Sequence, residues 1–466
     1  VEGYQSPIQT DILLDGKLPF KESGGVTFSR IWNDTEKSKA YDTQGNEILP
    51  GQSEFPRWMS AFAEDGTGYS GGALKYYLTE GSHTLTVKCS RENILIGSLE
   101  FSAVEPVPEY AAVAAGYEKS GYKSVSSKAA VTVQGENAAA KSDQTLYPQA
   151  DRTSPSVEPY NAAHICYNTI GGSQWKTAGQ WIEWQVELPE SGLYTISAHF
   201  KQALKSGNAS VRELYIDGSL PFAEAANITF PYKGSWQLSA ISDENGTPYS
   251  FYLEKGVHTL RLKVGLGKSA DVLLQAGKYL SELNRIYREI VVVTGASPDM
   301  YRSYNLDKVI PDTIADMKKI CGQLKELEKS VSASGGGTDK NLADIKRIYV
   351  QLEQMTADSD TIPKRLTNFK DNISSFGAWI NLAAEQPLEL DYIAFNPLNR
   401  ELGKGDAGFL AMTKHYLTQF VWSFVTDYAS VGQMTDDLTR KITVWQTTGR
   451  DQAQVLKSLI NSSFTP

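Results

Sequence analysis

The sequence predicts a multidomain protein with two antiparallel β-sandwich domains and a bundle of four helices inserted into the second sandwich. Three observations lead to this prediction. Short segments recur in the same order in 1–102 and 131–267, and their residues alternate between apolar and polar. A long helical stretch at 268–387 then precedes one more strand-like segment at 388–396.

The internal repeat is carried by four pairs of short segments. The pairs are LLDGKLPF (13–20) and YIDGSLPF (215–222), VTF (26–28) and ITF (228–230), RWMSAFAEDGTGY (57–69) and SWQLSAISDENGTPY (235–249), and YLTEGSHTLTVK (77–88) and YLEKGVHTLRLK (252–263). β-Branched and aromatic residues separated by Asp-Gly, Glu-Gly and Asn-Gly are typical of short antiparallel strands joined by tight turns. We place the first sandwich at 1–102, a linker at 103–130, and the second sandwich at 131–267 with 388–396.

The first copy is expected to be incomplete at its N-terminus. Ahead of its Asp-Gly turn, the second copy has strand-like segments at 131–137 and 179–200, whereas only 14 residues precede Asp15 in the first copy. The first copy also carries an insertion before Trp58. We expect the chain to be a fragment or a processed product. The opening strands of the first copy would then lie upstream, be absent or come from elsewhere.

Residues 268–387 are expected to form the inserted bundle. Apolar residues recur at spacings of three and four in four segments, which cover 270–295, 306–331, 339–357 and 361–384. Four amphipathic helices with short connections favour an up-and-down bundle. The segment LELDYIAF (388–395) then alternates as a half-buried strand does. We assign it as the last strand of the second sandwich, separated from the preceding strand by the bundle.

Composition and charge exclude several classes of function. The formal net charge is −9 and no basic stripe occurs, which argues against nucleic acid as a partner. No run of about 18 apolar residues occurs, so no segment is expected to span a membrane. Cys89, Cys166 and Cys321 are widely spaced, which argues against a disulfide framework and a zinc site. Hydrolase, metalloprotease and nucleotide-binding motifs are missing from the sequence, so we expect no enzyme activity.

Several segments of the second sandwich follow the order of a known family. They are ENAAAKSD (136–143), GGSQWKTAGQWIEWQVELPESGLYTISAHF (171–200), the Ile-Asp-Gly turn, the Gly-x-His-Thr-Leu strand and LDYI (390–393). This order resembles the β-jelly-roll carbohydrate-binding modules of families 6 and 35, over 131–267 and 388–396 and more loosely over 1–102. Gln180 departs from the family's Gly-Asp-Trp triplet. The resemblance implies a jelly roll that binds an oligosaccharide or polysaccharide.

Loop side chains of the second copy are candidates for contact with that sugar. A pyranose ring stacks on aromatic side chains, and amide or carboxylate groups bind its hydroxyls. The candidates are Trp175, Tyr167 and Tyr232 as stacking platforms, with Asn168 and Gln174 as polar partners, and Trp32 in the first copy. The alternative for each aromatic residue is packing in the core or within a loop.

The resemblance also implies a structural calcium ion between the first and last strands of the module. The matching residues are Gln134 and Glu136 near the first strand and Asp391 on the last. Their oxygen atoms are the hard ligands that Ca²⁺ prefers. The first copy has Gly97 in place of Asp391, so no such site is expected there. The alternative is a solvated pair of acids at a strand edge.

The C-terminal segment KITVWQTTGRDQAQVLKSLINSSF (441–464) places an apolar strand before an amphipathic helix. It resembles the opening of an extracellular solute-binding protein for sugars that feeds an ABC importer. The resemblance implies a helical connector at 397–440 and the truncated start of an α/β solute-binding domain at 441–466. It also implies an ABC permease as a partner and an extracellular, surface-anchored location in bacteria.

These observations favour non-catalytic carbohydrate recognition by a secreted or cell-surface solute-binding protein that serves oligosaccharide uptake. Two alternatives stay open. The chain could be an accessory, non-catalytic region of a large carbohydrate-active enzyme or cell-wall protein. It could also be a structural module that docks a protein partner.

Overall fold

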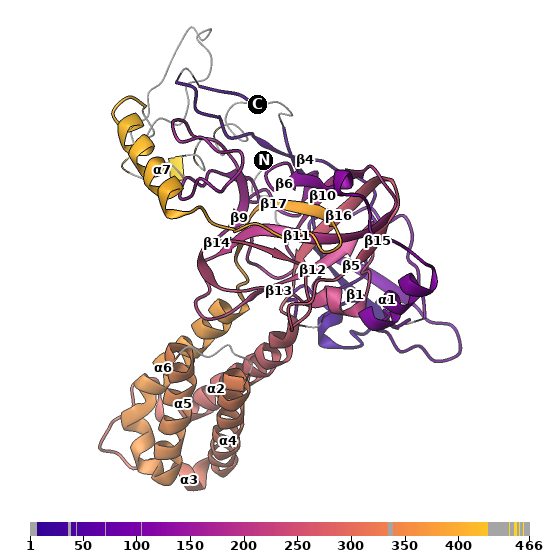
Figure 1. Ribbon diagram of the computed structural model, residues 1–466. Helices are drawn as coiled ribbons and strands as arrows, with labels where there is room; N and C mark the ends of the chain where they lie inside the picture. The colour runs from indigo at the N-terminus through magenta and orange to yellow at the C-terminus, as the bar shows by residue number, and fades with distance from the viewer. Residues whose placement is uncertain are drawn as a thin grey trace.

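The chain folds into stacked β-sheets with a helical bundle that projects from one end (Figure 1). This computed structural model describes residues 7–35, 39–42, 44–69, 71–103, 105–333 and 339–426, and a few isolated positions after 426. The sheets and the bundle have separate hydrophobic cores. The β-sandwich with its inserted bundle is therefore confirmed.

Two sheets of seven strands each form the main sandwich in the described residues. The strands of one sheet are β3 (Trp32–Asp34), β4 (Gln52–Glu54), β7 (Ala140–Lys141), β10 (Trp181–Leu188), β12 (Ser210–Ile216), β13 (Ile228–Phe230) and β16 (Gly256–Val264). Those of the other are β6 (Val131–Gln134), β8 (Pro148–Gln149), β9 (Thr169–Gly172), β11 (Gly192–Gln202), β14 (Lys233–Ala240), β15 (Phe251–Leu253) and β17 (Leu388–Pro397). The orders are β13-β12-β16-β10-β7-β3-β4 and β14-β11-β17-β9-β8, with β15 on β11 and β6 on β17.

The strand after the bundle, β17, lies inside the second sandwich. It runs antiparallel to β11, with Ser197 opposite Ala394 and Ala198 opposite Ile393. Its other neighbours are β6 and β9, which pair with its two halves. The segment LELDYIAF therefore completes the sheet that the preceding residues begin, as its alternation predicted.

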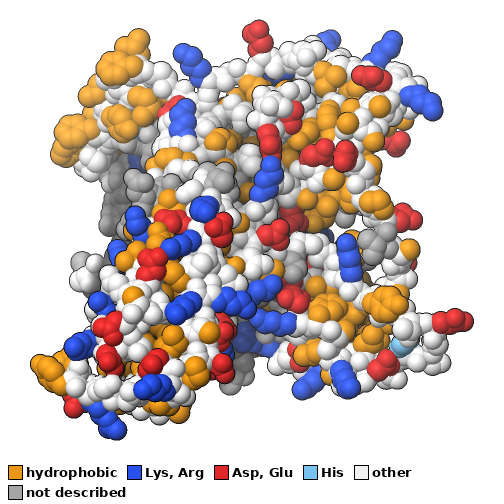
Figure 2. All heavy atoms as spheres, turned by 90° about the horizontal axis from the view of Figure 1, so that it is seen from below, with side chains coloured by type: hydrophobic (Ala, Val, Ile, Leu, Met, Phe, Trp, Pro, Cys, Tyr) orange, Lys and Arg blue, Asp and Glu red, His pale blue; other side chains and the backbone are white. Residues whose placement is uncertain are grey.

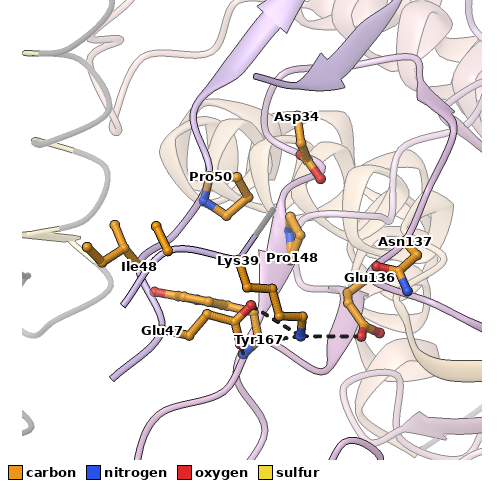
Figure 3. Close-up of a pocket in the computed structure, with 10 residues that line it drawn as sticks. Asp34, Lys39, Glu47, Ile48, Pro50, Glu136, Asn137, Pro148 and Tyr167 are labelled. Carbon is orange, nitrogen blue, oxygen red and sulfur yellow. Dashed lines mark hydrogen bonds and ion pairs between the residues drawn. The ribbon is translucent and has the colours of Figure 1, made fainter. Parts of the chain in front are cut away.

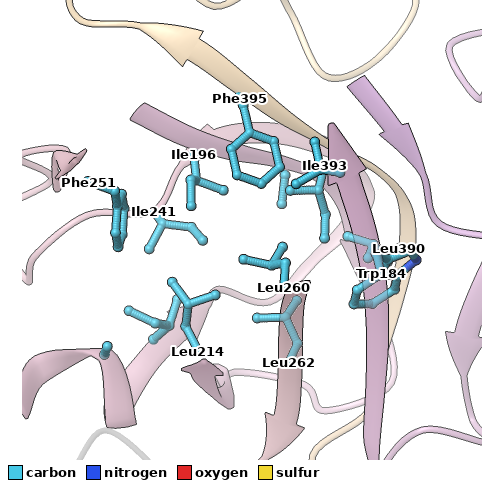
Figure 4. Close-up of a cluster of buried hydrophobic side chains, with 14 of the residues drawn as sticks. Trp184, Ile196, Leu214, Ile241, Phe251, Leu260, Leu262, Leu390, Ile393 and Phe395 are labelled. Carbon is cyan, nitrogen blue, oxygen red and sulfur yellow. The ribbon is translucent and has the colours of Figure 1, made fainter. Parts of the chain in front are cut away.

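The sandwich core forms because inward-facing residues of both sheets are apolar. In Figure 4, Ile196, Ile393 and Phe395 from β11 and β17 face Leu214 and Leu260 from β12 and β16. All five side chains are at most 2% exposed. Burying such a side chain contributes roughly 1.5–3 kcal/mol. The alternation of the strands therefore places the apolar side chains of both sheets in one core.

The bundle consists of long helices with one short addition in the described residues. They are α2 (Ala270–Thr294), α3 (Leu306–Val309), α4 (Pro311–Ala333), α5 (Asp339–Ala357) and α6 (Ile362–Ala384). The expected helix 306–331 is divided into α3 and α4. Pro311 cannot continue a helix that starts at Leu306, because proline has no backbone N–H to donate. Ile310, just before it, has a φ of −132° and is not helical. Figure 2 shows acidic and basic side chains interspersed over the molecule's lower face, without a field of one sign.

The repeat is visible as one hydrogen-bond motif that occurs twice. In the first copy, Asp15 binds His83 Nδ1 at 2.8 Å and accepts from the backbone N–H of Thr84 at 2.8 Å. In the second copy, Asp217 binds His258 Nδ1 at 2.7 Å and accepts from Thr259 N–H at 2.8 Å. Both aspartates have positive φ, at 50° and 49°. The shared Asp-Gly and Gly-x-His-Thr segments therefore form the same hydrogen-bonded turn in both copies.

The first copy forms a small sheet of its own and also adds two strands to one sheet of the main sandwich. Its strands β1 (Ile8–Leu14), β2 (Val26–Phe28) and β5 (Leu85–Arg91) form a three-stranded sheet. Its insertion supplies β3 and β4, and Trp32 of β3 pairs with Lys141 of β7. The Lys141 ammonium is fully buried and lies 2.5 Å from the Asp34 carboxylate. Trp32 is 7% exposed, so it packs in this sheet and is not a platform for sugar.

The expected linker at 103–130 contains a helix, α1 (Tyr110–Lys119). Tyr110 packs edge-on against Phe222 and Tyr249 of the second sandwich, and its hydroxyl lies 2.9 Å from Ser250 Oγ. The segment is therefore part of the second sandwich's packing. The prediction of a linker at 103–130 did not take into account that aromatic residues of this segment pack against the sandwich.

The C-terminal part of the described chain holds α7 (Phe409–Trp422), within the expected connector at 397–440. The expected α/β start at 441–466 lies outside the described residues, apart from isolated positions. In the part of the chain that the structure describes, no helix has the length and hydrophobicity to cross a bilayer.

Candidate functional site

The residues expected to bind calcium meet where the first and last strands of the second sandwich pair. Tyr392 of β17 lies opposite Gln134 of β6, and the Gly135 N–H donates to the Asp391 carbonyl at 2.5 Å. Glu136 is 5% exposed and Asp391 is fully buried. The chain therefore brings the strand that carries Asp391 beside Gln134 and Glu136, which lie more than 250 positions earlier in the sequence.

A small pocket opens beside Glu136 (Figure 3). Its cavity volume is about 70 Å³, far below the roughly 300–1,000 Å³ of small-molecule sites. The first copy's insertion contributes Lys39 and Glu47 to its lining, and Lys39 Nζ lies 3.2 Å from Glu47 and 3.9 Å from Glu136. The pocket has room for an ion or a few waters but not for a sugar ring.

Burial disfavours the charged forms of the acids at this site. It raises the pKa of Glu136 to about 7, an effect that the Asp391 carboxylate strengthens and Lys39 opposes. Burial also raises the pKa of Asp391 to about 6, although His199 opposes the rise. Gln134 Oε1 and Glu136 Oε2 are buried and accept no hydrogen bond from any described residue. Two oxygens at this site are therefore available to a cation.

His199 on β11 is a member of this site that sequence reasoning missed. Its Nδ1 contacts the Asp391 carboxylate, and its Nε2 lies 2.5 Å from the Gly405 carbonyl. Both ring nitrogens face acceptors, so the imidazolium form satisfies both. The rings of Trp236 and Tyr392 flank it, each with a centroid distance of 5.0 Å. An ionisable residue in the mostly apolar strand segment 192–200 is unusual, and this signal could have identified His199 as part of the site.

Three of the residues expected to contact sugar are buried. Trp175 is 0% exposed, and Tyr167 and Asn168 are each 3% exposed. The Trp175 ring packs against Trp184 and under the Arg212 guanidinium, whose carbon lies 4.1 Å from the ring centroid. Trp175 and Asn168 present no face to a ligand, and Tyr167 reaches only the small pocket beside Glu136, which is too small for a sugar ring. The structure therefore corrects the expectation that these residues contact sugar. Each is held by packing or hydrogen bonds that join loops to the sandwich.

The other two candidates do not converge with them on one surface. Gln174 is partly buried, and its Oε1 accepts from Gln149 Nε2 at 2.8 Å. Tyr232 is 42% exposed in the turn between β13 and β14. The described residues also contain no cluster of three or more His, Cys, Asp or Glu side chains able to hold a metal. Of the three residues expected to bind calcium, only Glu136 and Asp391 are carboxylates, so a metal there would also need the Gln134 amide and other oxygens.

Comparison with known proteins gives one family match. Residues 271–385 match the family model described as "Bacterial solute-binding protein, 4-helix bundle domain". The matched residues are those of the inserted bundle, α2 to α6. No curated protein matches the chain.

Solved structures show low similarity to the chain. CBM35 from Paenibacillus barcinonensis is 18% identical, with a TM-score of 0.21 and coverage of 29% of this chain and 87% of that one. A Paenibacillus sp. cycloisomaltooligosaccharide glucanotransferase complexed with cycloisomaltoheptaose is 22% identical, with a TM-score of 0.21 over 29% of this chain. The Podospora anserina GH26-CBM35 β-(1,4)-mannanase is 14% identical, with a TM-score of 0.21 over 30% of this chain. The chain spans 16% and 25% of the length of these two enzymes.

Proposed function

We propose that the chain is the carbohydrate-recognising, non-catalytic region of an extracellular solute-binding protein that serves oligosaccharide uptake. The observation that carries the proposal is the bundle, since 271–385 match the four-helix bundle domain of bacterial solute-binding proteins. The sandwich that holds the bundle adds support, because its segments resemble those of carbohydrate-binding modules. An ABC permease and a surface anchor would be engaged through parts of the protein outside the described residues.

The proposal predicts that the chain binds an oligosaccharide without cleaving it. Calorimetric titration with hexasaccharides of α-1,4-glucan, α-1,6-glucan, β-1,4-glucan, β-1,4-mannan and β-1,4-xylan should give a Kd between about 1 μM and 1 mM for at least one, or −8.2 to −4.1 kcal/mol. Chromatography of the same mixtures should return the sugar intact. Absence of binding across the panel at millimolar sugar would contradict the proposal, as would release of shorter products.

We further propose that the acid site holds a structural calcium ion. Gln134 Oε1 and Glu136 Oε2 supply unpartnered buried oxygens, and the Asp391 carboxylate lies on the paired strand. Bound Ca²⁺ would supply positive charge to buried acids and fix the first strand to the last. All three residues carry the hard oxygen donors that such an ion takes, and Glu136 lines the cavity of about 70 Å³.

The calcium proposal predicts a pH-dependent gain in stability. Because the folded-state pKa values of Glu136 and Asp391 are raised to about 7 and about 6, their protonation favours the folded state. That contribution is complete below the unfolded pKa values near 4 and is lost as the pH rises through 6 to 7. Calcium should therefore stabilise the chain more at pH 8 than at pH 5.

Thermal unfolding at pH 8 measures this effect. Ca²⁺ at a hundred times its Kd adds about 2.7 kcal/mol, which raises Tm by roughly 5–10 °C for a domain of this size. Glu136→Gln should abolish the response to Ca²⁺ and reduce the fall in stability between pH 5 and pH 8. Glu187→Gln, at an exposed position of β10, is the control and should keep both. Equal Tm values in Ca²⁺ and in EDTA would contradict the proposal.

A further inference from the structure

A second and larger pocket lies at the end of the sandwich away from the bundle. It is bounded by α1, the turn after β12 and the hairpin from β15 to β16, and its volume is about 370 Å³. The bundle follows the last residue of β16, Val264, whereas this pocket lies beside His258 near the first residue of that strand. At about 3.3 Å per residue, the two ends of β16 are separated by roughly 25 Å.

Three tyrosines form the aromatic part of this pocket and its border. Tyr122 and Tyr252 stack with a centroid distance of 3.7 Å and an interplanar angle of 12°. Tyr117 of α1 lines the pocket and lies 6.1 Å from Tyr122 and 6.5 Å from Tyr252. Tyr122 is 40% exposed, so part of the stack is open to solvent. Such faces suit the C–H side of a sugar ring.

Polar groups also line the pocket. Asp217 and Glu254 contribute exposed carboxylates, Ser219 contributes a hydroxyl, and His258 contributes its imidazole. Asp217 holds His258 Nδ1 at 2.7 Å, which fixes the orientation of both groups. Fixed acceptors beside an aromatic wall are what a neutral polyol needs for binding, and the two carboxylates would repel an acidic sugar.

Comparison with the first copy shows which features belong to the repeated turn and which belong to the pocket alone. Asp15, His83 and Tyr77 occupy the positions of Asp217, His258 and Tyr252 in the repeat. The Asp–His contact is present in both copies, so it belongs to the turn. Tyr77, however, is 87% exposed, whereas Tyr252 is half-buried beneath aromatic residues from 110–122. The helix α1 and the residues after it therefore convert a repeated turn into a pocket.

We propose that this tyrosine pocket, lined by Tyr117, Tyr252, Asp217, Glu254 and His258 and bordered by Tyr122, binds a neutral pyranose of the oligosaccharide. The inference rests on the proposed carbohydrate function and deepens it, because it assigns both the site and the class of sugar. The ring stacks on the tyrosines, and its hydroxyls bind the carboxylates of Asp217 and Glu254 and the hydroxyl of Ser219, while His258 holds Asp217 in place. The site therefore lies about one strand length from the loop of Trp175 and from the bundle.

Calorimetry on the whole chain tests the assignment. The ligand is the neutral hexasaccharide from the panel that binds most tightly, and an oligogalacturonate of equal length is the acidic probe. Tyr122→Ala and Glu254→Gln should each weaken binding of the neutral sugar at least tenfold. Tyr77→Ala, which alters the first copy's equivalent of Tyr252, is the control and should leave the Kd within twofold of the unchanged chain. The acidic probe should bind at least tenfold more weakly than the neutral one.

The outcomes distinguish the inference from the proposed function. If the unchanged chain binds sugar and both Tyr122→Ala and Glu254→Gln bind it equally well, the tyrosine pocket is wrong as the site. The proposed function would then still stand. Absence of binding by the unchanged chain to every sugar would overturn both. Tighter binding of the acidic probe would overturn the assignment to neutral sugars. Thermal unfolding of each variant shows whether it is folded, and Tyr122 is exposed enough for its alanine variant to remain so.

Discussion

Replacement of Trp175 by alanine is expected to destabilise the sandwich by about 3–5 kcal/mol, as removal of a fully buried Trp does in other cores. The side chain is 0% exposed and packs edge-on against Trp184, with ring centroids 6.3 Å apart. It also covers the guanidinium of Arg212, which is itself fully buried. The variant would leave both a cavity and a buried cation without its aromatic partner.

Thermal unfolding measures this loss, which corresponds to roughly 10 °C or more in Tm. Tyr232→Ala is the matched control, because this aromatic residue is 42% exposed and its removal should change stability by less than about 0.5 kcal/mol. A folded Trp175→Ala chain with unchanged Tm and lost sugar binding would restore the ligand role that the sequence suggested for this residue.

Excision of the bundle is expected to leave the sandwich folded, whereas removal of β17 is expected to unfold it. In the first variant, 270–385 are replaced by a short Gly/Ser linker. The two ends are close enough for this, because Arg212 pairs with Val264 and the neighbouring Val211 N–H donates to Gln386 Oε1 at 3.2 Å. In the second variant the chain ends at residue 387, and β11 loses the central partner that supplies Leu390, Ile393 and Phe395 to the core.

Circular dichroism during heating compares the two variants. The excised chain should unfold in one cooperative transition with a Tm within several degrees of the sandwich transition in the whole chain. The chain that ends at 387 should lack a cooperative β-sheet transition. The opposite order of stability would mean that the bundle, rather than β17, holds the sandwich together.

Local patterns predicted the parts of the fold that depend on one segment at a time. The three- and four-residue spacings of the bundle and the alternation of 388–395 reflect burial of one face, which any helix or strand in a core must show. The missing last strand of the second copy could be located because the first copy provided a comparison. Gln134, Glu136 and Asp391 were predicted to be neighbours from the resemblance to carbohydrate-binding modules, and the strands at 131–134 and 388–397 do pair.

Contacts between distant segments could not be predicted in this way. Nothing in the alternation of 32–34 indicates that β3 joins a strand at 140–141, because pairing partners are set by the whole sheet. The loop that holds Trp175 was expected to be exposed, yet buried Arg212 lies over it from β12. The tyrosine pocket depends on α1 folding back on the β15–β16 hairpin, a contact that the prediction of a linker at 103–130 left out.

The most direct test of the central claim is amide hydrogen exchange of 388–397 in the chain from which the bundle has been excised. β17 should exchange as slowly as β11, its antiparallel partner, because the strand's hydrogen bonds lie inside the sandwich. Exchange of 388–397 as fast as that of exposed loops, in a chain that is otherwise folded, would contradict the claim that the sandwich is completed by a strand that follows the bundle.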